Sequence, residues 1–308
     1  MIARAAAFAA LLVLATVGCS DSSSPADSAA DTTPRDASTE QTTPDASPDA
    51  AVCTARYTER VTGSVVDENG KGIANARPQL CLRLANTALV CLDPPFTDAE
   101  GKFEINVPES TRCIAEAVMR ALVPSTANAT TYCPVSLPSD ASPDVALASP
   151  FTVFATKPAT TLPPEGDVAQ ARVVRFDDGL EIDVIPKDTF LAAPGYAGLA
   201  ARRLAPDAPG VCFLDAAQRA KVSALYAFSP EGNLLDGGFT ARIPNGTNLP
   251  ANSDVALYLL GGLDCILEDG TLVGEGQWVN YGSGKVSADG ATVEAKIPCL
   301  TWFGYGPK

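Results

Sequence analysis

Short segments in which apolar and polar residues alternate run through most of the chain after residue 59. An alternation of period two is typical of a strand with one buried face, and residues 103–107, Phe-Glu-Ile-Asn-Val, show it clearly. Similar strand patterns lie at 60–66, 76–84, 89–92, 171–176, 180–185, 222–228, 239–243, 254–260, 277–279 and 291–297. Many short strands separated by turns predict an all-β protein built from sandwich domains.

Turn signals separate these segments. They lie at 67–72 and 96–102 in the first half of the chain, and at 231–233, 245–247 and 289–290 in the second. Gly70 and Gly101 stand where a tight turn requires a positive φ, and Asp67 and Asp98 can cap those turns through their carboxylates. The one helical candidate, 215–224, abuts a strand pattern, so we expect at most a short helical turn there.

The N-terminus has a different pattern. Arg4 is followed by an apolar run over 5–17 that has the length of a signal-peptide core and is too short to span a bilayer comfortably. After Cys19 the character changes: residues 20–52 carry seven acidic residues against the single Arg35, with many Ser, Thr and Pro. Such a segment cannot bury enough apolar surface to offset its ordering entropy, so we expect a disordered, extended acidic tether.

The residues that end this apolar run, Thr-Val-Gly-Cys at 16–19, resemble the lipobox of bacterial lipoproteins, with Thr16 where that family usually has Leu. The resemblance implies that the peptide before Cys19 is removed and that Cys19 is acylated, which anchors the protein in a membrane. Ser20 resembles the residue that permits sorting to the outer membrane in this family. The alternative is an ordinary secretory signal cut nearby, with Cys19 an unmodified thiol.

Two stretches of the first folded part carry a second resemblance. Residues 61–76, Val-Thr-Gly-Ser-Val-Val-Asp-Glu-Asn-Gly-Lys-Gly-Ile-Ala-Asn-Ala, and 97–105, Thr-Asp-Ala-Glu-Gly-Lys-Phe-Glu-Ile, resemble the carboxypeptidase regulatory-like domain. That module is a transthyretin-like β-sandwich without catalytic residues, and Gly72 stands close to where its members commonly have Pro. The stretches 241–255, 284–290 and 300–306 resemble ZU5-type β domains of secreted bacterial proteins, which implies architecture only.

With a Pro- and Thr-rich linker at 156–166, these observations predict four parts. They are a signal peptide (1–18), a tether (19–52), a regulatory-like β-sandwich (53–157) and a C-terminal β-sandwich domain (158–308).

Charge and histidine content exclude several function classes. Once Arg4 is removed with the signal peptide, 21 basic residues stand against 36 acidic ones, a net charge of −15, so we expect no nucleic-acid partner. The chain has no histidine, which removes the Ser-His-Asp triad, the Cys-His dyad and histidine-based zinc sites. The cysteines lack zinc-ligand spacing as well. We therefore expect no metal and no cofactor.

Nine cysteines in an exported chain predict disulfides. With Cys19 acylated, the eight that remain are Cys53, Cys81, Cys91, Cys113, Cys133, Cys212, Cys265 and Cys299. Cys81 and Cys91 lie symmetrically about Asn86, so a hairpin there places them opposite each other at bridging distance. Five of the eight precede the linker and three follow it. Complete pairing therefore requires an odd number of interdomain bridges, most simply one, with Cys53 as the candidate on the first side; the alternative is a free thiol in each domain.

Two groups of side chains could bind or act on a ligand. The aromatic residues Trp278, Tyr281, Trp302 and Tyr305 could stack on sugar rings, although aromatic residues in a sandwich more often form its core. Paired carboxylates of a hydrolase could come from the acids Asp177, Asp178, Glu181, Asp183, Asp264, Glu268 and Asp269. Calcium binding at the turn acids Asp67, Glu68, Asp98 and Glu100 is a further alternative that lacks the EF-hand pattern.

These observations together predict a noncatalytic, lipid-anchored protein of the cell envelope, exported and placed at the outer membrane. Its sandwich domains act as interaction or structural modules for an envelope protein or a glycan. The first alternative is a carbohydrate- or peptidoglycan-binding surface protein that uses the C-terminal aromatic residues. The second is a carboxylate-based hydrolase.

Overall fold

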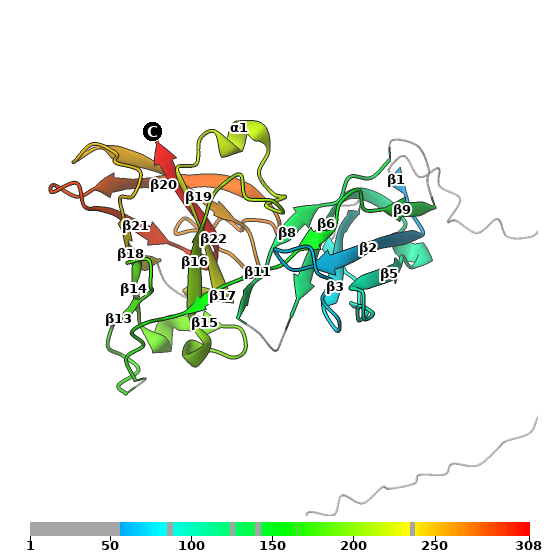
Figure 1. Ribbon diagram of the computed structural model, residues 1–308, viewed down its shortest axis with the longest axis horizontal. Helices are drawn as coiled ribbons and strands as arrows, with labels where there is room; N and C mark the ends of the chain where they lie inside the picture. Colours follow the sequence, from blue (N-terminus) through cyan, green and yellow to red (C-terminus); the bar gives the residue numbers. More distant parts are fainter. Residues whose placement is uncertain (1–55, 85–88, 124–126, 139–142, 165, 235–237) are drawn as a thin grey trace, which may run out of the picture. The chain divides into compact units, whose positions relative to one another are not determined.

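The computed structural model describes residues 56–84, 89–123, 127–138, 143–164, 166–234 and 238–308 (Figure 1). The predicted signal peptide, tether and hairpin turn at Asn86 lie outside these residues. The described chain is all-β, as predicted: its one α-helix, α1 (Ala216–Arg219), is a single turn that Asp215 and Gln218 cap reciprocally. Short 3-10 helices lie at Glu109–Thr111, Pro186–Asp188 and Tyr196–Gly198. No helix in the described segments has the length and apolar character needed to span a membrane.

The first part is a sandwich of two sheets, called here the N-terminal sandwich. One sheet has the order β1 (Arg56–Tyr57), β6 (Cys113–Leu122), β3 (Arg77–Leu84) and β4 (Leu89–Cys91), with β8 (Tyr132–Pro134) also on β6. The other has the order β10 (Phe151–Thr152), β2 (Arg60–Val66) and β5 (Lys102–Asn106), with β9 (Asp144–Ala146) also on β2. Val61 and Phe103 from one sheet share a buried core with Leu80 and Ile114 from the other. The short β7 (Asn128–Ala129) pairs with β11 (Phe154–Ala155).

The two turns predicted in this sandwich are present. Gly70 and Gly101 both have φ of 79°, in the left-handed region that glycine adopts at little cost. Asp67 accepts hydrogen bonds from the backbone N–H groups of Asn69 and Lys71, both at 2.9 Å. Asp98 caps its own turn in the same manner. The turn carboxylates are therefore used by the backbone.

The second part, called here the C-terminal sheet, is one continuous sheet curled around a single core. Its strands follow the order β12 (Lys157–Pro158), β16 (Ala200–Leu204), β17 (Ala224–Leu234), β22 (Cys299–Pro307), β19 (Asp254–Leu260), β20 (Trp278–Val286), β21 (Thr292–Ile297), β18 (Phe239–Pro244), β14 (Glu181–Val184) and β13 (Arg172–Arg175), with β15 (Thr189–Leu191) also on β17. Ile182, Tyr226 and Val293, from strands far apart in that order, meet in the same core. Curling lets one sheet supply both layers of a sandwich-like fold.

The two edges of the C-terminal sheet meet. Thr161, just after β12, and Arg175 in β13 exchange backbone hydrogen bonds of 3.2 and 3.0 Å. The outermost strands of the order given above are therefore linked to each other through this bridge, and the sheet wraps fully around its core.

The prediction of a turn at 231–233 is wrong. β17 runs as one strand from Ala224 to Leu234, and its register against β22 shifts between Ala227 and Gly232. Pro230 and Gly232 favour a turn when only the local sequence is considered. In the fold they lie in an irregular stretch of a buried strand. The consequence is that Glu231 is 8% exposed instead of lying at a turn.

Candidate functional site

An open groove of about 890 Å³ lies on the C-terminal sheet over β18, β20 and β21. Its lining includes Gly282 and Ser283 of β20, called here the groove floor, and Glu268 and Asp269 of the loop before β20. The charged side chains around it are Arg242, Lys285 and Lys296 on the basic side and Asp254, Glu268, Asp269 and Glu294 on the acidic side. Because the two signs nearly balance, the groove suits a polar ligand of low net charge.

Several groove contacts fix the side chains in place. The Tyr281 hydroxyl donates to the Lys296 carbonyl at 2.6 Å, and the Lys296 ammonium pairs with Glu268 at 3.2 Å. A Cβ added to Gly282 would meet no atom within 4 Å, and its backbone has no left-handed φ. The floor at Gly282 is therefore open space that a side chain could fill without disturbing the sheet.

The four predicted aromatic residues do not form one exposed platform. Trp302 and Tyr305 are fully buried, at 0% exposure. Trp278 is half-buried and stacks on Tyr258 with ring centroids 6.0 Å apart, while Tyr281 lines the groove. The favoured expectation, that these aromatic residues form the core, is confirmed for Trp302 and Tyr305, and the alternative of a shared stacking surface is wrong for them.

Trp302 lies where the two parts of the chain meet. Its ring packs edge-on against Phe154 at a centroid distance of 5.3 Å, and its Nε1–H donates to the Thr130 carbonyl at 3.0 Å. The same buried cluster contains Tyr132 from the N-terminal sandwich and Leu260 from the C-terminal sheet. An apolar core therefore joins the N-terminal sandwich to the C-terminal sheet.

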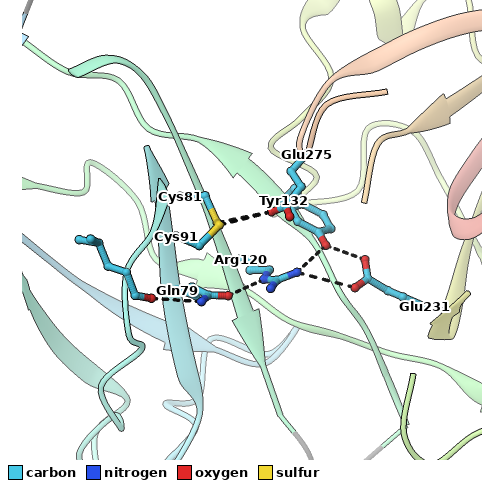
Figure 2. The surroundings of a disulfide bond; sticks show 8 residues. Gln79, Cys81, Cys91, Arg120, Tyr132, Glu231 and Glu275 are labelled. Atoms are coloured by element: carbon cyan, nitrogen blue, oxygen red, sulfur yellow. Dashed lines mark hydrogen bonds and ion pairs between the residues drawn. A yellow bond between two sulfur atoms is a disulfide. The ribbon is translucent and has the colours of Figure 1, made fainter. Parts of the chain in front are cut away.

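A buried polar network continues this interface (Figure 2). The Tyr132 hydroxyl donates to Glu231 Oε1 at 2.7 Å and accepts from Arg120 at 2.9 Å. Arg120 also donates to Gln79 Oε1 at 2.8 Å and lies 4.0 Å from the second Glu231 oxygen. Burial raises the pKa of Glu231 from 4.5 to about 7, and burial with the nearby Glu231 charge raises the pKa of Tyr132 well above its usual value.

Sequence reasoning missed this network because its members are far apart in the chain. Tyr132 and Glu231 are separated by 99 positions, and Glu231 is placed in a turn by its local sequence. The available signal was Glu231 itself, an acid that follows closely on the apolar run 224–228 of a predicted buried strand.

A second link across the interface is covalent. The disulfide Cys133–Cys212 joins β8 to the chain that follows β16, and Cys265–Cys299 lies within the C-terminal part. Cys81–Cys91 bridges β3 and β4 at directly paired positions, with the Cα atoms 3.9 Å apart, as the hairpin symmetry predicts. One bridge among the described residues thus crosses between the two parts.

The choice of Cys53 for that crossing bridge is wrong. Cys212, Cys265 and Cys299, the three cysteines after the linker, already have other partners. Cys133 makes the crossing instead, because β8 lies on the face of the N-terminal sandwich that contacts the C-terminal sheet. Cys113 is also disulfide-bonded, and Cys53 lies outside the described residues.

The acids considered for hydrolysis serve structural contacts. Glu181 and Asp183 both bind Arg242, at 3.1 and 2.6 Å, and Asp177 pairs with Lys157. Glu268 pairs with Lys296 beside the groove, and Asp269 caps a turn through the Thr271 N–H. Asp178 accepts from the Leu180 N–H, and burial raises its pKa. Asp264 adopts a positive φ of 50°.

The turn acids weighed for calcium are also used. Beyond the backbone bonds of Asp67 and Asp98, Glu68 pairs with Arg202 of β16, which ties a sandwich turn to the C-terminal sheet. Within the described segments, the one cluster with metal-ligand spacing is Cys81, Cys91 and Glu275. Its two cysteines are joined as a disulfide.

No family model matches the chain, and no curated protein matches it significantly.

Proposed function

We propose that this protein is a noncatalytic, lipid-anchored component of a cell envelope that holds a rigid β-module away from the membrane. The disulfides indicate an exported protein. The lipobox-like residues before Cys19 and the acidic segment that follows support an acyl anchor and a tether. The sandwich strands from Arg60 to Asn106 support the proposed regulatory-like module.

The observation that carries this proposal is the interface between the N-terminal sandwich and the C-terminal sheet. A buried Trp302 cluster, the Glu231 network and the Cys133–Cys212 bridge join them. Domains linked only by a flexible segment move relative to each other. A braced pair keeps its surfaces in fixed relation, which suits a structural or interaction module on a tether.

Replacing Cys19 tests the anchor. We expect the wild type to partition into the detergent phase of a membrane extract, because acyl chains bury apolar surface. We expect Cys19→Ala to move to the aqueous phase while its disulfides still form, which controls for export. Wild-type and variant protein in the same detergent phase would contradict the lipid anchor.

A second candidate function, glycan binding, is favoured by the groove. It offers the aromatic ring of Tyr281, the hydroxyl groups of Ser283 and Thr240, and nearly balanced charge, all of which suit a neutral polysaccharide strand. The proposed site is thus the groove, in place of the aromatic platform expected from the sequence.

Filling the groove floor tests this candidate. Gly282→Trp places a large ring in open space, so we expect at least a tenfold loss of binding to purified peptidoglycan sacculi with unchanged thermal stability. Asn280→Trp is the matched control, since Asn280 is exposed on the same strand but does not line the groove. If wild type and both variants bind alike, or the wild type does not bind, the groove is not a peptidoglycan site.

A further inference from the structure

The Cys81–Cys91 disulfide differs in setting from the other two described disulfides. It fastens β4, a three-residue strand at the edge of its sheet, and Cys91 is accessible to solvent. Cys265 and Cys299 are both 0% exposed, and Cys133 lies in the sandwich core. Accessible disulfides are the ones that exchange with external thiols.

A carboxylate from the C-terminal part lies against this disulfide. Glu275 Oε2 is 3.4 Å from the Cys81 sulfur and 4.0 Å from the Cys91 sulfur (Figure 2). A disulfide has no S–H group, so neither contact is a hydrogen bond in the oxidised protein. In the dithiol form, each S–H can donate to Glu275, and the reduced state gains contacts that the oxidised state lacks.

The loop that carries Glu275 is built to approach the sandwich closely. Gly276 has φ of 76°, and a Cβ there would lie 2.6 Å from the Val118 side chain. Its N–H donates to the Gly261 carbonyl at 2.9 Å, and Gln277 accepts from the Gly274 N–H at 3.2 Å. These contacts place Glu275 over the sulfur atoms without relying on the disulfide.

An open cavity of about 290 Å³ adjoins the disulfide on the side of Cys81. Cys81, Arg83, Glu275 and Gln277 are among its lining residues. Arg83 is paired with Glu116 at 3.2 Å, so Glu275 is the cavity acid in contact with sulfur. The space suits a low-molecular-weight thiol.

We propose that Cys81–Cys91 is a thiol–disulfide exchange site for small thiols, in which Glu275 stabilises the dithiol by accepting hydrogen bonds from its S–H groups. In reduction, an external thiolate attacks the accessible Cys91 sulfur and forms a mixed disulfide with it, while the Cys81–Cys91 bond breaks. Cys81 leaves with the electron pair and takes up a proton from solvent. A second external thiolate attacks the mixed disulfide, releases Cys91 as a thiolate that is then protonated, and leaves as the oxidised small disulfide. In reoxidation, the Cys91 thiolate attacks an oxidised small disulfide, forms a mixed disulfide and releases one small thiolate. Cys81 then loses its proton to solvent and attacks the Cys91 sulfur, which re-forms the Cys81–Cys91 bond and releases the second small thiolate.

The first test compares the disulfides within one molecule. The purified full chain is equilibrated with glutathione buffers of graded ratio, free thiols are alkylated, and each cysteine is mapped by mass spectrometry. We expect Cys81 and Cys91 to be alkylated under conditions that leave Cys265 and Cys299 protected. Reduction of Cys81–Cys91 only together with, or after, Cys265–Cys299 would overturn the proposal.

The second test changes the carboxylate at about pH 6.5, where ordinary cysteine thiols remain protonated. Glu275→Ala removes the acceptor, so we expect the reduced-to-oxidised ratio of Cys81–Cys91 to fall about tenfold, as a lost hydrogen bond to a charged group implies. Glu275→Gln keeps an uncharged acceptor, so its reduced-to-oxidised ratio should lie between those of the wild type and Glu275→Ala. Glu116→Ala removes a neighbouring cavity acid without a sulfur contact and should change the ratio less than about twofold.

Continued protection of Cys265 and Cys299 in every variant shows that the fold is intact. Equal ratios for Glu275→Ala and Glu116→Ala would remove Glu275 from the mechanism and overturn the proposal.

Discussion

Glu231 is the residue that the fold treats most unusually. A carboxyl in this buried position is favoured in its neutral form, which explains a pKa raised to about 7 by burial. Between pH 4.5 and 7 the folded protein therefore holds a proton that the unfolded chain has released. By linkage, the contribution of Glu231 to the free energy of unfolding is largest below pH 4.5 and is lost as the pH rises through 7.

Glu231→Gln isolates this effect because it keeps the shape of the side chain and removes its titration. The free energy of unfolding of the wild type minus that of the variant should rise when the pH is lowered from 8 to 5, by on the order of 3 kcal/mol. Urea unfolding of both proteins at pH 8 and pH 5 measures this difference in the free energy of unfolding. Glu268→Gln, at an exposed ion pair, is the control and should show a far smaller pH-dependent difference. A wild-type minus Glu231→Gln difference that is the same at both pH values would contradict the shifted titration.

The strands show why local pattern predicts some elements and misses others. β5 and β21 bury alternate residues of a period-two sequence, and the alternation predicts them within a residue or two. β6, Cys-Ile-Ala-Glu-Ala-Val-Met-Arg-Ala-Leu, is rich in helix-favouring residues and is absent from the sequence prediction. It forms because pairing with β3 along its whole length overrides local propensity.

Because of their glycine and proline residues, the longer strands of the C-terminal sheet are predicted shorter than they are. β20 extends to Val286 through Gly282 and Gly284, and β17 extends to Leu234 past Pro230. Both residue types are turn signals in isolation, but each strand here is held by neighbours on both sides. The groove lies on β20 and its neighbours, so it could not be located before these strand lengths and the sheet order were known.

The Cys133–Cys212 bridge makes a prediction about the molecule as a whole. Protease cleavage within 159–164 cuts the chain between β12 and β13. On a denaturing gel without reductant we expect the two fragments to remain one band, and to separate when the disulfides are reduced. The double variant Cys133→Ser, Cys212→Ser should separate without reductant. The control is the double variant Cys265→Ser, Cys299→Ser, which loses a bridge within one part and should remain one band without reductant. Separation of the cleaved wild type without reductant would show that no bridge crosses.

Parity of the cysteines predicted a crossing bridge, but the residue that makes it depends on how the two parts face each other. Cys53 was chosen for its position near the end of the tether, which is a property of the chain. Cys133 is selected by its place in β8, next to Tyr132, which is buried against the C-terminal part. Counting residues limits how many bridges cross, whereas surface packing decides which cysteines form them.

The meeting of Thr161 and Arg175 also affects how copies of this protein behave when crowded. An open sheet ends in strands whose unpaired N–H and C=O groups can add a strand from another molecule, which is a route to aggregation. The curled sheet uses some of those groups on each other, through the bridge between Thr161 and Arg175. Many copies packed side by side on one surface would therefore find less free backbone at the ends of this sheet than an open sheet offers, which favours separate molecules at high local concentration.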